Sequence, residues 1–184
     1  MIFAKTSKGA SRLSEQLRKK KMIKGYFAIV HGVPTQKKGF LYNKLEKNEK
    51  DNIVRESKNG KECVLYYECI ESKEGISLIF AVPITGRTHQ IRVQMSLAGY
   101  PLAGDVKYGS KHMTDIHRMK KHELALWSSV ISIKHPTEDR IIKAYSIPSS
   151  GIWDMFEQSE YKEFSESVLN ERFCEFEKIK SGSK

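Results

Sequence analysis

The sequence predicts an α+β domain built on a largely antiparallel, mixed sheet flanked by helices. Three observations lead to this fold class. Short segments rich in β-branched and aromatic residues recur along the chain, two of them are joined by a short polar turn, and helical patterns are inserted between them. A chain of 184 residues, 39% of them hydrophobic, is long enough to fold around one sizeable core.

The first predicted element is a helix over residues 6–21. Thr6 or Ser7 can cap it, and its apolar residues recur at spacings of three and four. Its last turn is strongly basic and consists of Arg18, Lys19, Lys20 and Lys21. These cations either complement the negative end of the helix dipole or contact phosphates, and the sequence leaves both interpretations open.

A strand is predicted next, over residues 25–32, because β-branched and aromatic residues are bounded there by glycines. Tyr26, Ala28 and Val30 share one face of this strand, since side chains alternate along a strand. Residues 33–61 are mostly polar and predict a hairpin or a surface loop.

The strongest hairpin signal comes from residues 63–70 and 75–82, two apolar segments that flank a polar turn at residues 71–74. The second strand leads directly into a predicted helix over residues 87–98, which ends at Gly99. The helix therefore begins where an apolar strand ends.

Two more strands are predicted over residues 124–133 and 140–147. From residue 149 onward, aromatic residues alternate with many charged ones. This pattern predicts one or two amphipathic helices packed on the body of the protein, with disorder after Lys180.

The distribution of charge indicates a polyanionic partner. The formal net charge is +10, and the segment that begins at Asp154 contains five basic and eight acidic residues. Residues 1–153 consequently carry a net charge of +13. The basic surface is expected on the body of the protein rather than on its tail.

Several function classes lose support from the sequence. The longest apolar runs are far too short to cross a bilayer and no signal peptide is visible, so we expect a cytoplasmic protein with no membrane contact. Three cysteines without a CxxC pair predict reduced thiols. Glycine-rich phosphate loops are missing, which predicts no nucleotide cofactor. His112, His117 and His122 are spaced five residues apart, which does not predict a metal site.

Polar residues are densest in the run GRTHQIR at residues 86–92, at the predicted junction of strand and helix. Arg87 and Thr88 would stand at the start of the helix, where backbone N–H groups attract anions. Arg92 lies one turn after Thr88 and would project from a similar face. The spacing predicts a site for a carboxylate or a phosphate, and a purely structural arginine network explains it equally well.

Two linked motifs decide between these interpretations. The run GRTHQIRV at residues 86–93, followed by GYPLAGDVKYG at residues 99–109, closely resembles the signature of the RluA family of RNA pseudouridine synthases. Residues 24–32 resemble the family's strand with an active-site tyrosine, and residues 3–10 resemble the segment that leads into the preceding helix.

The resemblance implies a pseudouridine synthase-like catalytic domain over residues 1–150, incomplete at its N-terminus, and a helical tail over residues 151–184. It implies isomerisation of uridine to pseudouridine in structured RNA, ribosomal or transfer, without a metal or organic cofactor. Tyr26 would stack on the flipped-out base and take part in proton transfer, and Arg92 would pair with the family's catalytic aspartate. RNA contacts are expected from Arg87, His89, Lys107, Lys19 and Lys20.

Two departures from the family pattern bear on activity. The family's catalytic aspartate ends a His-Arg-Leu-Asp stretch that precedes the segment resembling the start of this chain, so we expect this chain to lack the nucleophile and to be inactive. We also expect an unpaired sheet edge and exposed core surface. Trp127 stands where the family often has histidine. The alternatives are a non-catalytic RNA-binding module derived from the same fold and a basic interaction domain without an RNA role.

Overall fold

The computed structural model describes residues 2–19, 21–109, 123–172, 176 and 178. In this part of the chain, strands form one sheet in the order β3-β2-β4-β5-β1-β6-β7, and every neighbouring pair is antiparallel. The predicted α+β class is therefore confirmed. The strands are β1 Ile23–His31, β2 Lys38–Asn48, β3 Ile53–Glu56, β4 Lys61–Lys73, β5 Ile76–Pro83, β6 Leu126–Lys134 and β7 Ile141–Tyr145.

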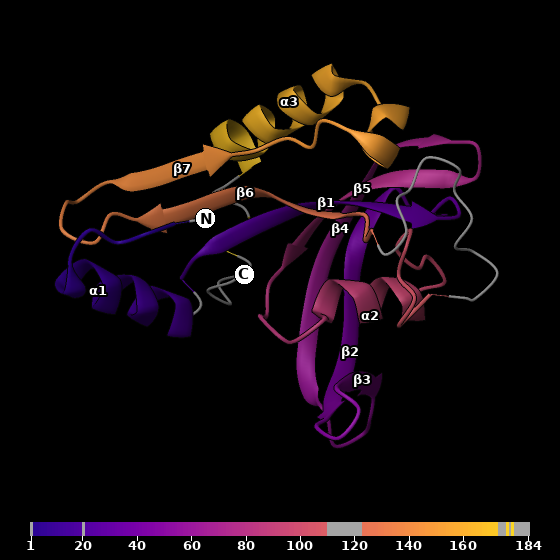
Figure 1. Cartoon of the computed structure of the whole chain (residues 1–184), viewed down its shortest axis with the longest axis horizontal. Helices are drawn as coiled ribbons and strands as arrows, with labels where there is room; N and C mark the ends of the chain where they lie inside the picture. Colours follow the sequence, from indigo (N-terminus) through magenta and orange to yellow (C-terminus); the bar gives the residue numbers. More distant parts are fainter. Residues whose placement is uncertain (1, 20, 110–122, 173–175, 177, 179–184) are drawn as a thin grey trace.

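Helices cover both faces of the sheet. Helices α1 (Ser7–Arg18) and α2 (Gln90–Leu97) lie on one side, whereas α3 (Gln158–Ser167) lies on the other (Figure 1). A 3-10 helix, η1 (Gly151–Met155), precedes α3, and a π-helical turn, η2 (Val168–Arg172), follows it. Within the described ranges, no helix is long and apolar enough to span a bilayer.

The central strand β1 contributes to two cores because its side chains alternate between the faces of the sheet. Phe27 and Ile29 belong to the core beneath α3, and Ala28 and Val30 belong to the core beneath α2. Tyr26 packs against the second core, on the face predicted from the sequence. Both faces of β1 are buried, which explains its nearly continuous apolar sequence.

The hairpin between β4 and β5 is confirmed, but its turn is shorter than expected. Strand β4 extends to Lys73 and β5 begins one residue later than expected, at Ile76, so only Glu74 and Gly75 remain between them. These residues have φ angles of +52° and +78°, and positive φ at both positions gives a turn whose twist matches that of the strands. Of the two predictions for residues 33–61, a hairpin or a surface loop, the structure shows the hairpin, formed by β2 and β3, and β2 also pairs with β4.

Helix α1 begins as predicted and ends earlier. Its N-cap is Thr6, whose side-chain oxygen accepts a hydrogen bond from the backbone N–H of Gly9 at 3.1 Å. The helix ends at Arg18 rather than at residue 21. Gln16 attaches it to the sheet through two hydrogen bonds with the backbone of Lys134, at 2.9 and 3.0 Å.

The C-terminal segment packs deeply onto the sheet. Tyr161 is fully buried, lies edge-to-face against Phe27 with ring centroids 5.1 Å apart, and donates a hydrogen bond to the carbonyl oxygen of Trp153 at 2.8 Å. The amphipathic helix expected in this region is α3. The expectation of disorder after Lys180 and the three histidines at 112, 117 and 122 fall outside the described residues.

A pair of carboxyl groups joins α3 to the sheet. Glu160 lies beside Glu71 of β4, and each has a buried Oε2 with no hydrogen-bond partner among the described residues. Burial and the neighbouring Glu71 raise the pKa of Glu160 to about 7, with Lys73 opposing this shift and Glu157 adding to it. A proton on Glu160 can therefore be donated to Glu71.

We predict that the contribution of Glu160 to stability falls as the pH rises from about 4.5 to about 7. In this range the native state keeps the proton on Glu160 and the unfolded state releases it, so this group's contribution to the free energy of unfolding falls with pH. Urea denaturation across this range measures the slope of stability against pH. Glu160→Gln should make that slope more positive than in the unaltered protein, whereas Glu163→Gln on the exposed side of the same helix should not change it. An unchanged slope in Glu160→Gln would contradict the shared proton.

Candidate active site

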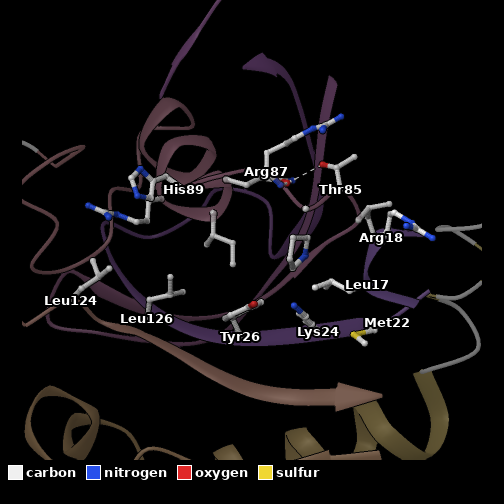
Figure 2. Close-up of a pocket in the computed structure, with 16 residues that line it drawn as sticks. Leu17, Arg18, Met22, Lys24, Tyr26, Thr85, Arg87, His89, Leu124 and Leu126 are labelled. Carbon is white, nitrogen blue, oxygen red and sulfur yellow. Dashed lines mark hydrogen bonds between the residues drawn. The ribbon is translucent and has the colours of Figure 1, made fainter. Parts of the chain in front are cut away.

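A pocket of about 790 Å³ opens between the end of α1, β1 and the junction of β5 with α2. Figure 2 shows Tyr26 and Lys24 along one side of the pocket, Arg87 and His89 opposite them, and Leu17 with Arg18 at one end. Its interior is mostly apolar. Its cations are Arg18, Lys24, Arg87 and Arg92.

The position of Tyr26 follows from an irregularity in β1. The pairing of β1 with β6 shifts between Gly25 and Tyr26. A Cβ atom on Gly25 would lie 2.3 Å from Cζ of Phe80, so only glycine allows this close packing. Ser128 is the partner of Tyr26 in the pairing of β1 with β6, and its side chain only partly opposes the effect of burial on the pKa of Tyr26. Burial raises the pKa of Tyr26, which keeps the hydroxyl protonated at neutral pH.

The turn before α2 is shaped by the side chain of Gln90. Its Oε1 accepts hydrogen bonds from the backbone N–H of Arg87 at 3.1 Å and from the hydroxyl of Thr85 at 2.9 Å. The helix consequently begins at Gln90 and not at residue 87, as the sequence suggested. His89 adopts a left-handed conformation with φ of +53°, which turns the chain into the helix.

Gln94 fixes the orientation of Gln90. Nε2 of Gln90 donates to the carbonyl oxygen of Val64 at 2.9 Å and to Oε1 of Gln94 at 3.0 Å. Nε2 of Gln94 in turn donates to the carbonyl oxygen of Leu41 and to the side chain of Asn43. The backbone N–H of Arg87 at one end and the carbonyl oxygen of Leu41 at the other define which side-chain atoms accept and which donate, so the two amides have one orientation. Together they connect the Arg87 turn to β2.

Arg92 forms a bidentate ion pair with Asp105. Nε donates to Oδ2 at 2.7 Å and Nη2 donates to Oδ1 at 2.6 Å. The side chain of Asp105 is 0% exposed and that of Arg92 is 18% exposed. Burial alone would raise the pKa of Asp105, but hydrogen bonds from Arg92 and from two backbone N–H groups outweigh it and lower the pKa. Arg92 also lines the pocket, and its Nη1 is the guanidinium nitrogen that Asp105 does not engage.

His89, which lines the pocket, contacts Tyr108. The Nδ1 atom of His89 lies 2.8 Å from the hydroxyl oxygen of Tyr108. The same hydroxyl accepts a hydrogen bond from the backbone N–H of Val54 at 3.0 Å. Tyr108 stacks beneath Arg92, with the guanidinium carbon 5.0 Å from the ring centroid. Burial, assisted by the charge of Arg92, lowers the pKa of His89, so the ring is neutral at pH 7.

The structure brings together four of the seven residues selected from the sequence: Tyr26, Arg92, Arg87 and His89 all line the pocket. Lys107 does not line it and donates instead to the carbonyl oxygen of Asn52. Lys19 forms an ion pair with Glu15 at 2.6 Å, also away from the lining. Lys20 falls outside the described residues.

Two lining cations were not selected from the sequence. Lys24 shares a strand face with Tyr26, so the period of two along β1 could have identified it. Arg18 was noticed only as part of the basic helix end, and no local signal separates it from Lys19. Trp127 is not part of the lining, and its Nε1 donates to the carbonyl oxygen of Ser146.

No aspartate or glutamate lines the pocket in the part of the chain that the structure describes. Asp105 is not a lining residue, and its carboxylate is held in the ion pair with Arg92, which does line the pocket. These features define an α+β domain with an apolar pocket of nucleoside size and a cationic rim, suited to a flat ring attached to phosphate.

Comparisons with known proteins identify the family. A family model described as RNA pseudouridylate synthase matches residues 1–97. Ribosomal large subunit pseudouridine synthase C of Vibrio parahaemolyticus is 36% identical over 140 residues, which are 76% of this chain and 44% of that protein. An uncharacterised RNA pseudouridine synthase of Bacillus subtilis, YlyB, is 32% identical over 137 residues, which are 74% of this chain and 44% of that protein.

The fold comparison agrees with this assignment. Human RNA pseudouridylate synthase domain containing 1 superposes with a TM-score of 0.67 at 20% sequence identity, over 79% of this chain and 62% of that one. This chain belongs to the RNA pseudouridylate synthase family, and its resemblance to the RluA branch is confirmed. It spans less than half the length of these curated relatives.

Proposed function

We propose that the pocket binds a flipped-out uridine of an RNA substrate and provides Tyr26 and Arg92 for its isomerisation to pseudouridine. The observation that carries this proposal is the convergence of Tyr26 and Arg92 on one apolar pocket with a cationic rim. A base inside an RNA helix is inaccessible, and an aromatic ring recovers part of the stacking that the base loses on extrusion. Cations around the opening neutralise the adjoining phosphates.

Each group has a defined part in this proposal. Tyr26 stacks on the base and, because its hydroxyl remains protonated, is able to donate a proton. Arg92 is held rigidly by Asp105, with Nη1 left to hold a catalytic carboxylate in its ionised form. That carboxylate is not supplied by the described lining, so we propose that this chain by itself does not turn over substrate.

The relatives' names point to ribosomal RNA as the substrate class, and we carry that over to this protein as part of the proposal. Transfer RNA is the other substrate class that the sequence analysis predicts. We also propose a cytoplasmic location, as expected from the sequence. A non-catalytic RNA-binding module is the competing function, and the pocket lining without an acidic residue is the observation that favours it.

Tritium release from RNA labelled at carbon 5 of uridine tests the proposal, because the new bond at carbon 5 expels that hydrogen. We expect no release with this chain. We expect release when the chain is fused behind a segment that carries the His-Arg-Leu-Asp stretch of the RluA family. Tyr26→Phe in that fusion should slow release by about 10²–10⁴-fold, the usual contribution of a proton-transfer group.

The outcomes separate the alternatives. RNA binding without release by the fusion would favour the binding module. Binding that does not weaken with salt would contradict an RNA role altogether, since phosphate neutralisation is strongly salt-dependent. Release by this chain alone, lost in Tyr26→Phe, would show that one of its own carboxylates is the nucleophile.

A further inference from the structure

A second cleft, of about 410 Å³, lies on the other side of the Arg87 turn. The first cleft is the pocket around Tyr26, and the two share Gly86 and Arg87 as a common wall. The second cleft is otherwise lined by the hairpin of β2 with β3 and by the turn that precedes β4. Its polar side chains include Glu46, Lys47, Asn59, Lys61 and Thr88.

Arg87 serves both clefts. Its guanidinium points away from Tyr26 in the close-up (Figure 2). Its Nε is buried and has no hydrogen-bond partner among the described residues. Because this Nε is buried, the part of Arg87 that lines the cleft and can meet a ligand is the outer end of its guanidinium, which would donate charge-assisted hydrogen bonds to a phosphate oxygen.

The floor of the second cleft is preformed. A Cβ atom on Gly60 would lie 2.7 Å from backbone atoms of Lys44 and Leu45, so only glycine lets this turn lie directly on β2. The backbone N–H of Ser57 donates to the carbonyl oxygen of Lys44 at 2.9 Å and joins the turn to β2, and the N–H of Gly60 donates to the carbonyl oxygen of Ser57 at 3.0 Å and closes the turn. The cleft is therefore a fixed part of the sheet.

The charges in this cleft fit a nucleotide better than a simple anion. Lys47 is paired with Glu49 at 2.6 Å, which leaves Lys61 and Arg87 as the cations able to meet a phosphate. Glu46 adds a carboxylate, which repels a phosphate but accepts a hydrogen bond from an amino group on a base.

We propose that the second cleft binds the nucleotide adjacent to the target uridine in the same RNA strand. This proposal rests on the proposed function of the first cleft. One phosphate joins two successive nucleotides, and the shared wall places Arg87 where that phosphate passes between the clefts. Lys61 contacts the phosphate group, and Glu46 selects a base with an exocyclic amino group over uracil.

A matched pair of lysines makes this testable with the 184-residue chain. Lys58 lies in the turn before β4 and Lys61 is the first residue of β4; both are exposed, and only Lys61 lines the cleft. Binding to a fluorescent single-stranded hexanucleotide, with one uridine between cytidines, is measured by anisotropy from low to moderate salt. Lys61→Gln should weaken binding about 5- to 10-fold and reduce the salt slope by about 0.7, as for one lost phosphate contact on a single strand. Lys58→Gln should change affinity less than about 2-fold.

The base preference is tested separately. The unaltered protein should prefer cytidine neighbours to uridine neighbours by about 5-fold or more, and Glu46→Gln should remove that preference. Equal losses in Lys61→Gln and Lys58→Gln, or no preference for the neighbouring base, would overturn the proposed subsite.

Failure of the first cleft is distinguishable from failure of the second. If Tyr26→Ala weakens binding but the two lysine variants behave alike, the uridine pocket stands and the adjacent subsite is wrong. If Tyr26→Ala leaves binding unchanged, or the chain does not bind the oligonucleotide, the proposed function fails and the subsite fails with it.

Discussion

Asp105→Asn should lower the free energy of unfolding by about 3–5 kcal/mol, because it leaves the partly buried charge of Arg92 without its partner. The asparagine has the same shape, yet its amide nitrogen must face either Nε or Nη2 of Arg92, both of which are donors. Urea denaturation at pH 7 measures the effect. Since Asp105 has a lowered pKa, its contribution is lost as the pH falls through that value, and the two proteins should converge in acid.

The control is an ion pair at the surface. Glu138 accepts a hydrogen bond from Arg140, and both side chains are more than half exposed, at 55% and 57%. Glu138→Gln should therefore change stability by less than about 1 kcal/mol. A loss in Asp105→Asn no larger than this would show that the buried pair does not hold the pocket together.

Tyr161→Ala should lower the free energy of unfolding by about 3–5 kcal/mol, the usual cost of removing a buried aromatic side chain. Tyr161 contacts Phe27 of the central strand and satisfies the carbonyl oxygen of Trp153. The prediction tests whether residues 151–169 are part of one cooperative unit with the sheet. A single unfolding transition, shifted as a whole, is the expected result.

Tyr161→Phe separates the ring from its hydroxyl. It keeps the aromatic packing and removes one buried hydrogen bond, so the loss should be about 1 kcal/mol. Two transitions in Tyr161→Ala, with the sheet unfolding at its original urea concentration, would instead show that the C-terminal segment is a separately folding appendage, as its boundary at residue 150 in the sequence suggested.

The sheet's inner strands were predictable because their signals are local. The apolar run of β1, with its alternation of Tyr26, Ala28 and Val30, already specifies which side chains face which side. The turn of the β4–β5 hairpin and the Thr6 cap of α1 likewise depend on neighbouring residues. Strand β2 was less clear, since its polar sequence acquires strand structure only through pairing with β4.

The pocket residues also fall into two groups, those that local motifs indicate and those that only the packing of distant elements brings into the lining. Tyr26 and Arg92 could be selected from motifs, because each lies within a short run whose residues the family resemblance matches. Asp105 lies within the second motif, residues 99–109, and nothing in its spacing of 13 residues from Arg92 indicates that it holds Arg92. Lys24 and Arg18 join the lining only because α1 is docked beside β1.

By itself the sequence determined the fold class, the central strands, the family and four residues of the pocket lining, because these depend on local periodicity and on short contiguous motifs. Only the tertiary structure decided the partner of Arg92, the lining cations Arg18 and Lys24, and the second cleft beside Arg87. These depend on contacts between residues far apart in the chain, and such contacts arise from the packing of whole elements that no local pattern encodes.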